Sequence, residues 1–122
     1  METKATGFAS PAQGYEEQNI DLNRLLVPNP PATFFMRLTS GDMAELGLMR
    51  DSILVVDRSK DPANNSIVLI RHEGQFYCRL ILIDGGKTLF TNGKTTISPI
   101  PDDTEIIGTV SASIKIYDSI SY

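Results

Sequence analysis

Two short stretches of this sequence carry side chains with the capacity for chemistry. The first is Ser40-Gly41-Asp42-Met43, where a hydroxyl stands close to a carboxylate. The second contains Arg79, a cation within a run of alternating side chains. A serine becomes a nucleophile when a neighbouring base removes its proton. Guanidinium groups stay protonated because their pKa is above about 12, so Arg79 cannot be that base.

The elements that must position these side chains are two strands and a short helix. Residues 33–39 alternate large apolar side chains with mostly polar ones, which predicts a half-buried strand. Met43–Met49 predicts about two helical turns, with Met43, Leu46 and Met49 on one face. Ile53–Val56 predicts a short buried strand. A turn and a helix between two strands can present a reactive side chain.

The whole stretch from Thr33 to Ser59 resembles the self-cleaving serine peptidase domain of LexA, phage repressors and, above all, UmuD. Members of that family carry S-G-D-S-M, in which the second serine is the nucleophile, followed by a strand that ends in V-D. Placing Ile53–Asp57 on that strand puts Met43 on the family methionine. The resemblance therefore implies that the nucleophilic serine is deleted between Asp42 and Met43.

Two further segments extend the resemblance. Gly7–Ala12, Tyr15–Asn23 and Leu25-Leu26 are similar to the UmuD segment that follows its cleavage site. Gly74–Arg79 resembles the strand that supplies the general-base lysine, and Arg79 stands at the matching position. The resemblance implies a degenerate catalytic site made of Ser40, Gly41, Asp42, Met43 and Arg79. It also implies a vestigial cleavage site at Thr6-Gly7, with the substrate arm almost absent.

Some of these residues have other interpretations. Ser40 is the alternative nucleophile, but a shift along a strand moves a side chain by roughly 3.3 Å per residue and reverses its face. Arg79 is also interpreted as a half-buried cation that pairs with Asp42 or Glu45. Cys78 is expected to be a small buried hydrophobe rather than a reactive thiol.

No metal or cofactor site is predicted. His72 is interpreted as a polar residue at a strand end, because no Asp, Glu or Cys stands near it at metal-ligand spacing.

The chain of 122 residues is predicted to fold as one domain of mostly β structure. The resemblance specifies a strongly bent LexA/UmuD C-terminal-like sheet with one or two short helices. Residues 1–31 are expected to form a mobile arm, with helical turns within residues 20–26, and residues 32–122 the peptidase-fold domain. Further strands are predicted at 66–71, 75–83, 87–91, 96–100 and 105–117, the last with a bulge or bend at Gly108.

Charge and hydropathy exclude several classes of protein. The net charge of −4 and the scattered arginines argue against direct binding of nucleic acid. No run approaches the ~20 apolar residues that a membrane span needs, and the N-terminus lacks the pattern of a secretory signal. We therefore expect a cytoplasmic protein without a membrane partner.

The resemblance leads to one main hypothesis and two alternatives. The main hypothesis is a noncatalytic homodimer that binds a UmuC-like translesion DNA polymerase in the SOS response, with the RecA filament as a further partner. The alternatives are a self-cleaving peptidase that uses Ser40, and a decoy that heterodimerises with an active UmuD or a LexA-type repressor. The strand at 105–117 is expected to leave an apolar face and an edge for dimerisation.

Overall fold

The structure is a computed structural model that describes residues 19–97 and 100–118. Its seven strands form one antiparallel sheet in the order β1-β2-β7-β3-β4-β5-β6. The strands are β1 (Thr33–Arg37), β2 (Ile53–Asp57), β3 (Ile67–His72), β4 (Gln75–Asp84), β5 (Lys87–Thr91), β6 (Thr96–Ile97) and β7 (Glu105–Ile114). Three short helical elements complete the described chain: α2 (Leu22–Leu26), η1 (Pro30–Ala32) and η2 (Ala44–Leu46). The prediction of a mostly β domain is confirmed.

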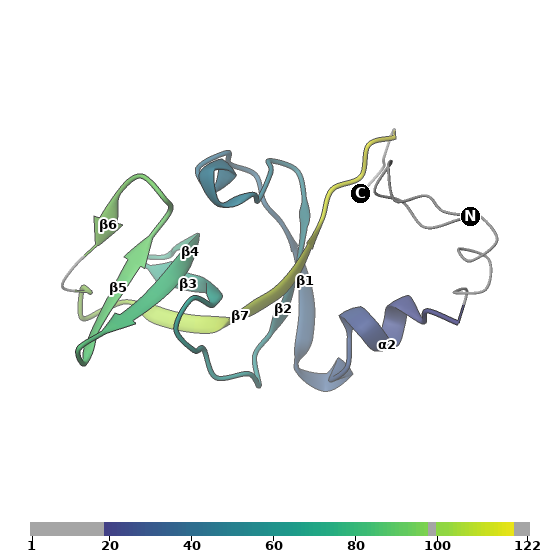
Figure 1. Cartoon of the computed structure of the whole chain (residues 1–122), viewed down its shortest axis with the longest axis horizontal. Coiled ribbons are helices and arrows are strands. Elements are labelled where there is room, and N and C mark those ends of the chain that lie inside the picture. The colour runs from purple at the N-terminus through teal and green to yellow at the C-terminus, as the bar shows by residue number, and fades with distance from the viewer. Residues whose placement is uncertain (1–18, 98–99, 119–122) are drawn as a thin grey trace, which may run out of the picture.

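The long strand β7 connects the two halves of the sheet and curves between them (Figure 1). Its pairing shifts register between Val55 and Val56 of β2 and between Leu69 and Ile70 of β3. Gly108 lies at the second shift, where an added Cβ would come within 2.8 Å of a Val56 methyl group. Such an atom does not fit, so glycine permits this close approach. The predicted irregularity at Gly108 is confirmed.

The prediction that the last strand leaves an uncovered edge is confirmed only in part, because β2 does not pair with residues 105–108 of β7 and β3 does not pair with residues 111–114. β7 ends at Ile114 rather than Tyr117, and β2 and β3 pair with its two sides. The edge strands of the sheet are β1 and β6. Alternating side chains report which face of a sheet a residue occupies, but they carry no information about the neighbours of a strand.

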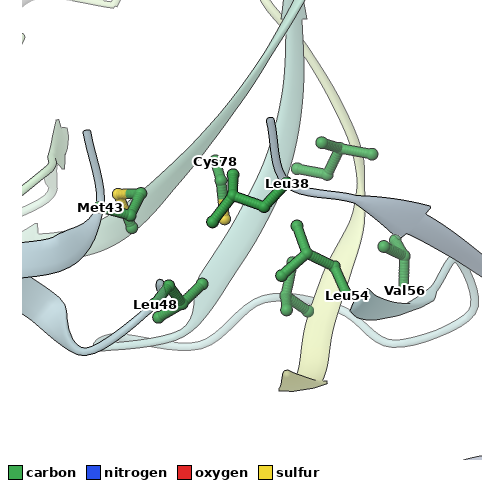
Figure 2. Close-up of a cluster of buried hydrophobic side chains, with 8 residues drawn as sticks. Leu38, Met43, Leu48, Leu54, Val56 and Cys78 are labelled. Atoms are coloured by element: carbon green, nitrogen blue, oxygen red, sulfur yellow. The ribbon is translucent and has the colours of Figure 1, made fainter. Parts of the chain in front are cut away.

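The core consists of two clusters on opposite faces of the sheet. Successive residues of β3 point to opposite faces, and Leu69 belongs to one cluster whereas Val68 and Ile70 belong to the other. The larger cluster, shown in part in Figure 2, contains Leu38, Met43, Leu48, Leu54, Val56, Leu69, Cys78 and Val110. The smaller one contains Val68, Ile70, Ile81 and Phe90.

The connection from β1 to β2 differs from its prediction. Instead of about two helical turns, Met43–Met49 contains only the 3-10 turn η2, which ends at Gly47 in the left-handed conformation (φ 89°). Met43 is fully buried, whereas Met49 is 48% exposed and Leu48 takes the buried place. Because η2 is one short turn, the predicted face of Met43, Leu46 and Met49 does not form.

The short helix expected within residues 20–26 is confirmed as α2. The Asp21 carboxylate caps its N-terminus by accepting from the backbone N–H groups of Asn23 (3.1 Å) and Arg24 (3.3 Å). The helix ends at Leu26, shortly before Pro28 and the 3-10 turn that begins at Pro30. Within the described ranges, no helix has the length and apolar character that crossing a bilayer requires.

Candidate functional site

Arg79 and Asp42 form an ion pair between β4 and the turn after β1. The Nη1 of Arg79 donates to Asp42 Oδ2 at 3.0 Å and to the backbone carbonyl of Cys78 at 2.7 Å. Its guanidinium also lies 5.3 Å from the centre of the Tyr77 ring. The Arg79 side chain is 12% exposed, so the prediction of a half-buried, paired cation is confirmed. Asp42 is the partner, whereas Glu45 lies 3.9 Å from Lys94.

The local geometry of β4 makes this contact possible. β5 pairs with β4 only from Leu80 to Asp84, so β5 does not cover the part of β4 that precedes Leu80. Arg79 is the last residue before this paired region. Its long side chain can therefore reach past the edge of the sheet to Asp42.

Ser40 binds the same carboxylate as Arg79. Its hydroxyl donates to Asp42 Oδ1, and the backbone N–H of Asp42 donates back to Ser40 Oγ at 3.3 Å. Burial alone would raise the pKa of Asp42, but the hydrogen bonds from Ser40 and Arg79, with the charge of Arg79, lower it below its ordinary value. A carboxylate with a lowered pKa is a weak base. Asp42 therefore cannot readily activate Ser40.

The remaining residues near the turn are buried and inert. Met43 is fully buried and Cys78 is 3% exposed, and both belong to the larger core cluster (Figure 2). Burial raises the pKa of the Cys78 thiol to about 12, although the positive charge of Arg79 opposes this rise. The thiol is therefore neutral near pH 7, and the prediction of a small buried hydrophobe is confirmed.

A cavity of about 220 Å³ opens beside the turn, between β1 and β4. The side chains that border it include Met36, Leu38, Ser40, Asp42, Tyr77 and Cys78. The Ser40–Asp42 pair therefore faces a space that is open to a ligand or a chain segment. The predicted cleavage site at Thr6-Gly7 lies outside the described residues.

The acidic side chains around His72 were not predicted from the sequence. Its Nδ1 lies 2.9 Å from Asp103 Oδ1, and its Nε2 lies 3.8 Å from Glu73. His72 ends β3 as predicted, but the statement that no acid stands near it at metal-ligand spacing is wrong. Asp103 is distant in sequence and is brought close because Arg71 pairs with Glu105 in the sheet. The ligating atoms of these three side chains lie within 4.8 Å of one another, a spacing that could hold a metal ion.

Comparison with known proteins identifies the family. The family model described as Peptidase S24-like matches residues 1–111. The chain belongs to this Peptidase S24-like family. The resemblance to LexA and UmuD is thereby confirmed.

Three relatives narrow this assignment within the Peptidase S24-like family. Protein SamA of Salmonella typhimurium is 32% identical over 108 residues, which cover 88% of this chain and 77% of SamA. Protein ImpA of Escherichia coli is 30% identical over 116 residues, covering 95% and 74%. Protein MucA of Escherichia coli is 33% identical over 114 residues, covering 90% and 78%. These UmuD-family relatives support a UmuD-like role in SOS mutagenesis.

Replacing Asp42 by asparagine should reduce stability in a pH-dependent way. Because folding lowers the pKa of Asp42 below 3.8, its charged form stabilises the native state above that pH, and this contribution disappears as the pH falls through the native pKa. The partly exposed pair should contribute less than about 1 kcal/mol. Urea unfolding should show Asp42→Asn less stable than the natural chain at pH 7 and equal to it near pH 2. An equal difference at both pH values would contradict the role of this charge.

Proposed function

We propose that this chain is a noncatalytic UmuD-like protein that acts as the dimeric partner of a UmuC-like translesion DNA polymerase in the SOS response. The observation that carries this proposal is the Arg79–Asp42 ion pair, with the Ser40 hydroxyl on the same carboxylate. Arg79 occupies the position that the resemblance assigns to the base, and Asp42 stands directly before the point at which the nucleophilic serine is deleted. An ion pair there provides structure but neither an activated nucleophile nor a removable proton.

Self-cleavage in this family needs a neutral lysine amine as the base for serine. Arg79 keeps its proton, and the lowered pKa of Asp42 makes that carboxylate a poor substitute. Loss of the nucleophile or the base typically costs on the order of 10⁶ in rate. These arguments favour the noncatalytic function over a peptidase that uses Ser40.

The exposed apolar side chains in α2 and just before it support a role for the N-terminal region in binding the polymerase. Ile20, Leu22 and Leu25 are 61%, 63% and 66% exposed. None of the residues of α2 itself is buried. Leucines that remain exposed on one short helix are typical of a surface that a partner covers. We therefore propose that Gly7–Leu26 binds the polymerase, whereas Met1–Thr6 is dispensable.

Capture of a purified UmuC-like polymerase on the immobilised chain tests this function. The full chain and a variant lacking residues 1–6 should bind equally, and a variant lacking residues 1–26 should lose binding. Leu25→Asp should weaken binding because it places a charge on the exposed face of α2. Lys87 is exposed at the start of β5. The variant Lys87→Asp is therefore the matched control and should bind like the natural chain. No capture by the full chain, or loss of capture on removal of residues 1–6, would contradict the proposal.

The chain should form a homodimer. β3 does not pair with residues 111–114 of β7. On the edge strand β1 the Phe35 side chain is 58% exposed, and Tyr117, beyond β7, is 90% exposed. UmuD-like domains associate through their C-terminal region, which contains Tyr117. Sedimentation equilibrium at micromolar concentration should therefore give twice the chain mass of 13.4 kDa. A mass near 13.4 kDa would count against the dimer.

A further inference from the structure

A second hollow in the surface, here called the arginine-flanked groove, lies beside β1 and β7. Its volume is about 490 Å³. Phe34, Met36, Phe76 and Ile106 line it, and the charged side chains that border it are Arg58, Arg71 and Glu105. The groove shares Met36 and Phe76 with the cavity beside the turn but contains neither Ser40, Asp42 nor Arg79. It is therefore a surface distinct from the degenerate site.

The floor of the groove is apolar and open to solvent. Phe76 is 48% exposed and Ile106 is 40% exposed. Phe34 and Met36 pack against the larger core cluster with their inner sides, which fixes the floor on the sheet. Contiguous exposed apolar side chains in a concave surface are typical of a binding site for another chain.

The charge of the groove selects the kind of chain that can bind. Arg71 forms an ion pair with Glu105, and both side chains remain about half exposed. The Arg58 guanidinium lies 5.9 Å from the centre of the Phe34 ring. Among the ion pairs found between described residues, none involves Arg58. The neighbouring Asp57 accepts instead from the hydroxyl and backbone N–H of Ser59.

These contacts leave one uncompensated positive charge next to an apolar floor, on a chain whose net charge is −4. A guanidinium over an aromatic ring is held in a fixed orientation and can present two N–H donors to a carboxylate. A ligand with the complementary pattern has a large apolar side chain next to an acidic one. The expected ligand contacts are the apolar side chain on Phe76 and Ile106, and the carboxylate on Arg58.

We propose that the arginine-flanked groove binds an extended segment of a partner protein in which an aromatic or large aliphatic residue is flanked by Asp or Glu. The edge strand β1 runs along the groove and offers its outer side to such a segment. The proposal goes beyond the polymerase assignment because it specifies the chemistry of the bound segment. It holds or fails independently of the polymerase.

The probe is an acetylated peptide, Glu-Glu-Phe-Leu-Glu-Glu, titrated into the ¹⁵N-labelled full chain. The amide signals of Phe76 and Ile106 should shift in a saturable way. Arg58→Glu should weaken binding by about tenfold or more, because a charge-assisted hydrogen bond is lost. Lys87→Glu is the matched control, because it changes the net charge of the chain by the same amount at an exposed residue at the start of β5. It should leave the affinity for the peptide within about twofold of the natural value. Ile106→Ala should weaken binding through the loss of apolar contact.

Four results would overturn the proposal. The first is the absence of saturable shifts at Phe76 and Ile106. The second is an equal effect of Arg58→Glu and Lys87→Glu, which would mean that only net charge matters. The third is equal binding of the peptide Lys-Lys-Phe-Leu-Lys-Lys. The fourth concerns the chain's own Tyr15-Glu16-Glu17: if their replacement by Ser-Lys-Lys shifts the groove signals without peptide, the occupant is this segment rather than a partner.

Discussion

Insertion of a serine between Asp42 and Met43 should leave the chain uncleaved in the presence of activated RecA filaments. The inserted hydroxyl would restore the family pattern, but Arg79 would still occupy the position of the base. Its Nη1 forms an ion pair with Asp42 Oδ2 at 3.0 Å. A guanidinium cannot accept the serine proton. The missing base alone should keep the rate lower by on the order of 10⁶.

Adding Arg79→Lys to the serine insertion is the minimum change expected to produce cleavage. A lysine can lose its proton when burial lowers its pKa, and position 79 is only 12% exposed. Intact-mass spectrometry should show one full-length species for the insertion alone and a product that begins at Gly7 for the combined variant. Arg79→Lys without the insertion is the matched control and should stay intact. Cleavage of the insertion variant with Arg79 present would show that the base is misassigned.

Replacing Met43 by alanine should be among the most destabilising changes in the chain. Met43 is fully buried in the larger core cluster, next to the turn that carries Asp42. Truncation of a buried methionine to alanine removes apolar contacts and leaves a cavity, which costs about 2–5 kcal/mol. The same change at Met49, which is 48% exposed, should alter stability by less than about 0.5 kcal/mol.

Urea unfolding followed by circular dichroism measures both methionine variants in one experiment. Met43→Ala should lower the unfolding midpoint strongly and leave the slope of the transition unchanged. Met49→Ala should superimpose on the natural chain. If the two variants shift the midpoint equally, the assignment of Met43 to the core is wrong.

The strands were predicted well because their signals are local. The alternation in residues 33–39 and the turn at Glu73-Gly74 fix β1, β3 and β4 within about two residues. The helix predicted for Met43–Met49 failed because the left-handed Gly47 ends it after one 3-10 turn. The free edge predicted for 105–117 is confirmed only in part, because β2 and β3 each pair with a portion of β7. Strand order depends on pairing between distant segments, and a single strand does not encode its neighbours.

The candidate site was predictable where one long side chain could reach only a few acids. Arg79 had Asp42 and Glu45 as its possible partners, and the structure selects Asp42. The pair of His72 and Asp103 could not be found in the same way, because their contact depends on the register between β3 and β7. The arginine-flanked groove was missed for a similar reason: its residues come from separate strands, and each alone has an ordinary pattern.

We propose that this member of the Peptidase S24-like family works without self-cleavage. The most direct test is intact-mass spectrometry of the natural chain after incubation with activated RecA filaments, with an active UmuD as the positive control in the same tube. UmuD should be cleaved while this chain keeps its full mass of 13.4 kDa. A product of this chain that begins at Gly7, and that disappears in the Ser40→Ala variant, would contradict the proposal.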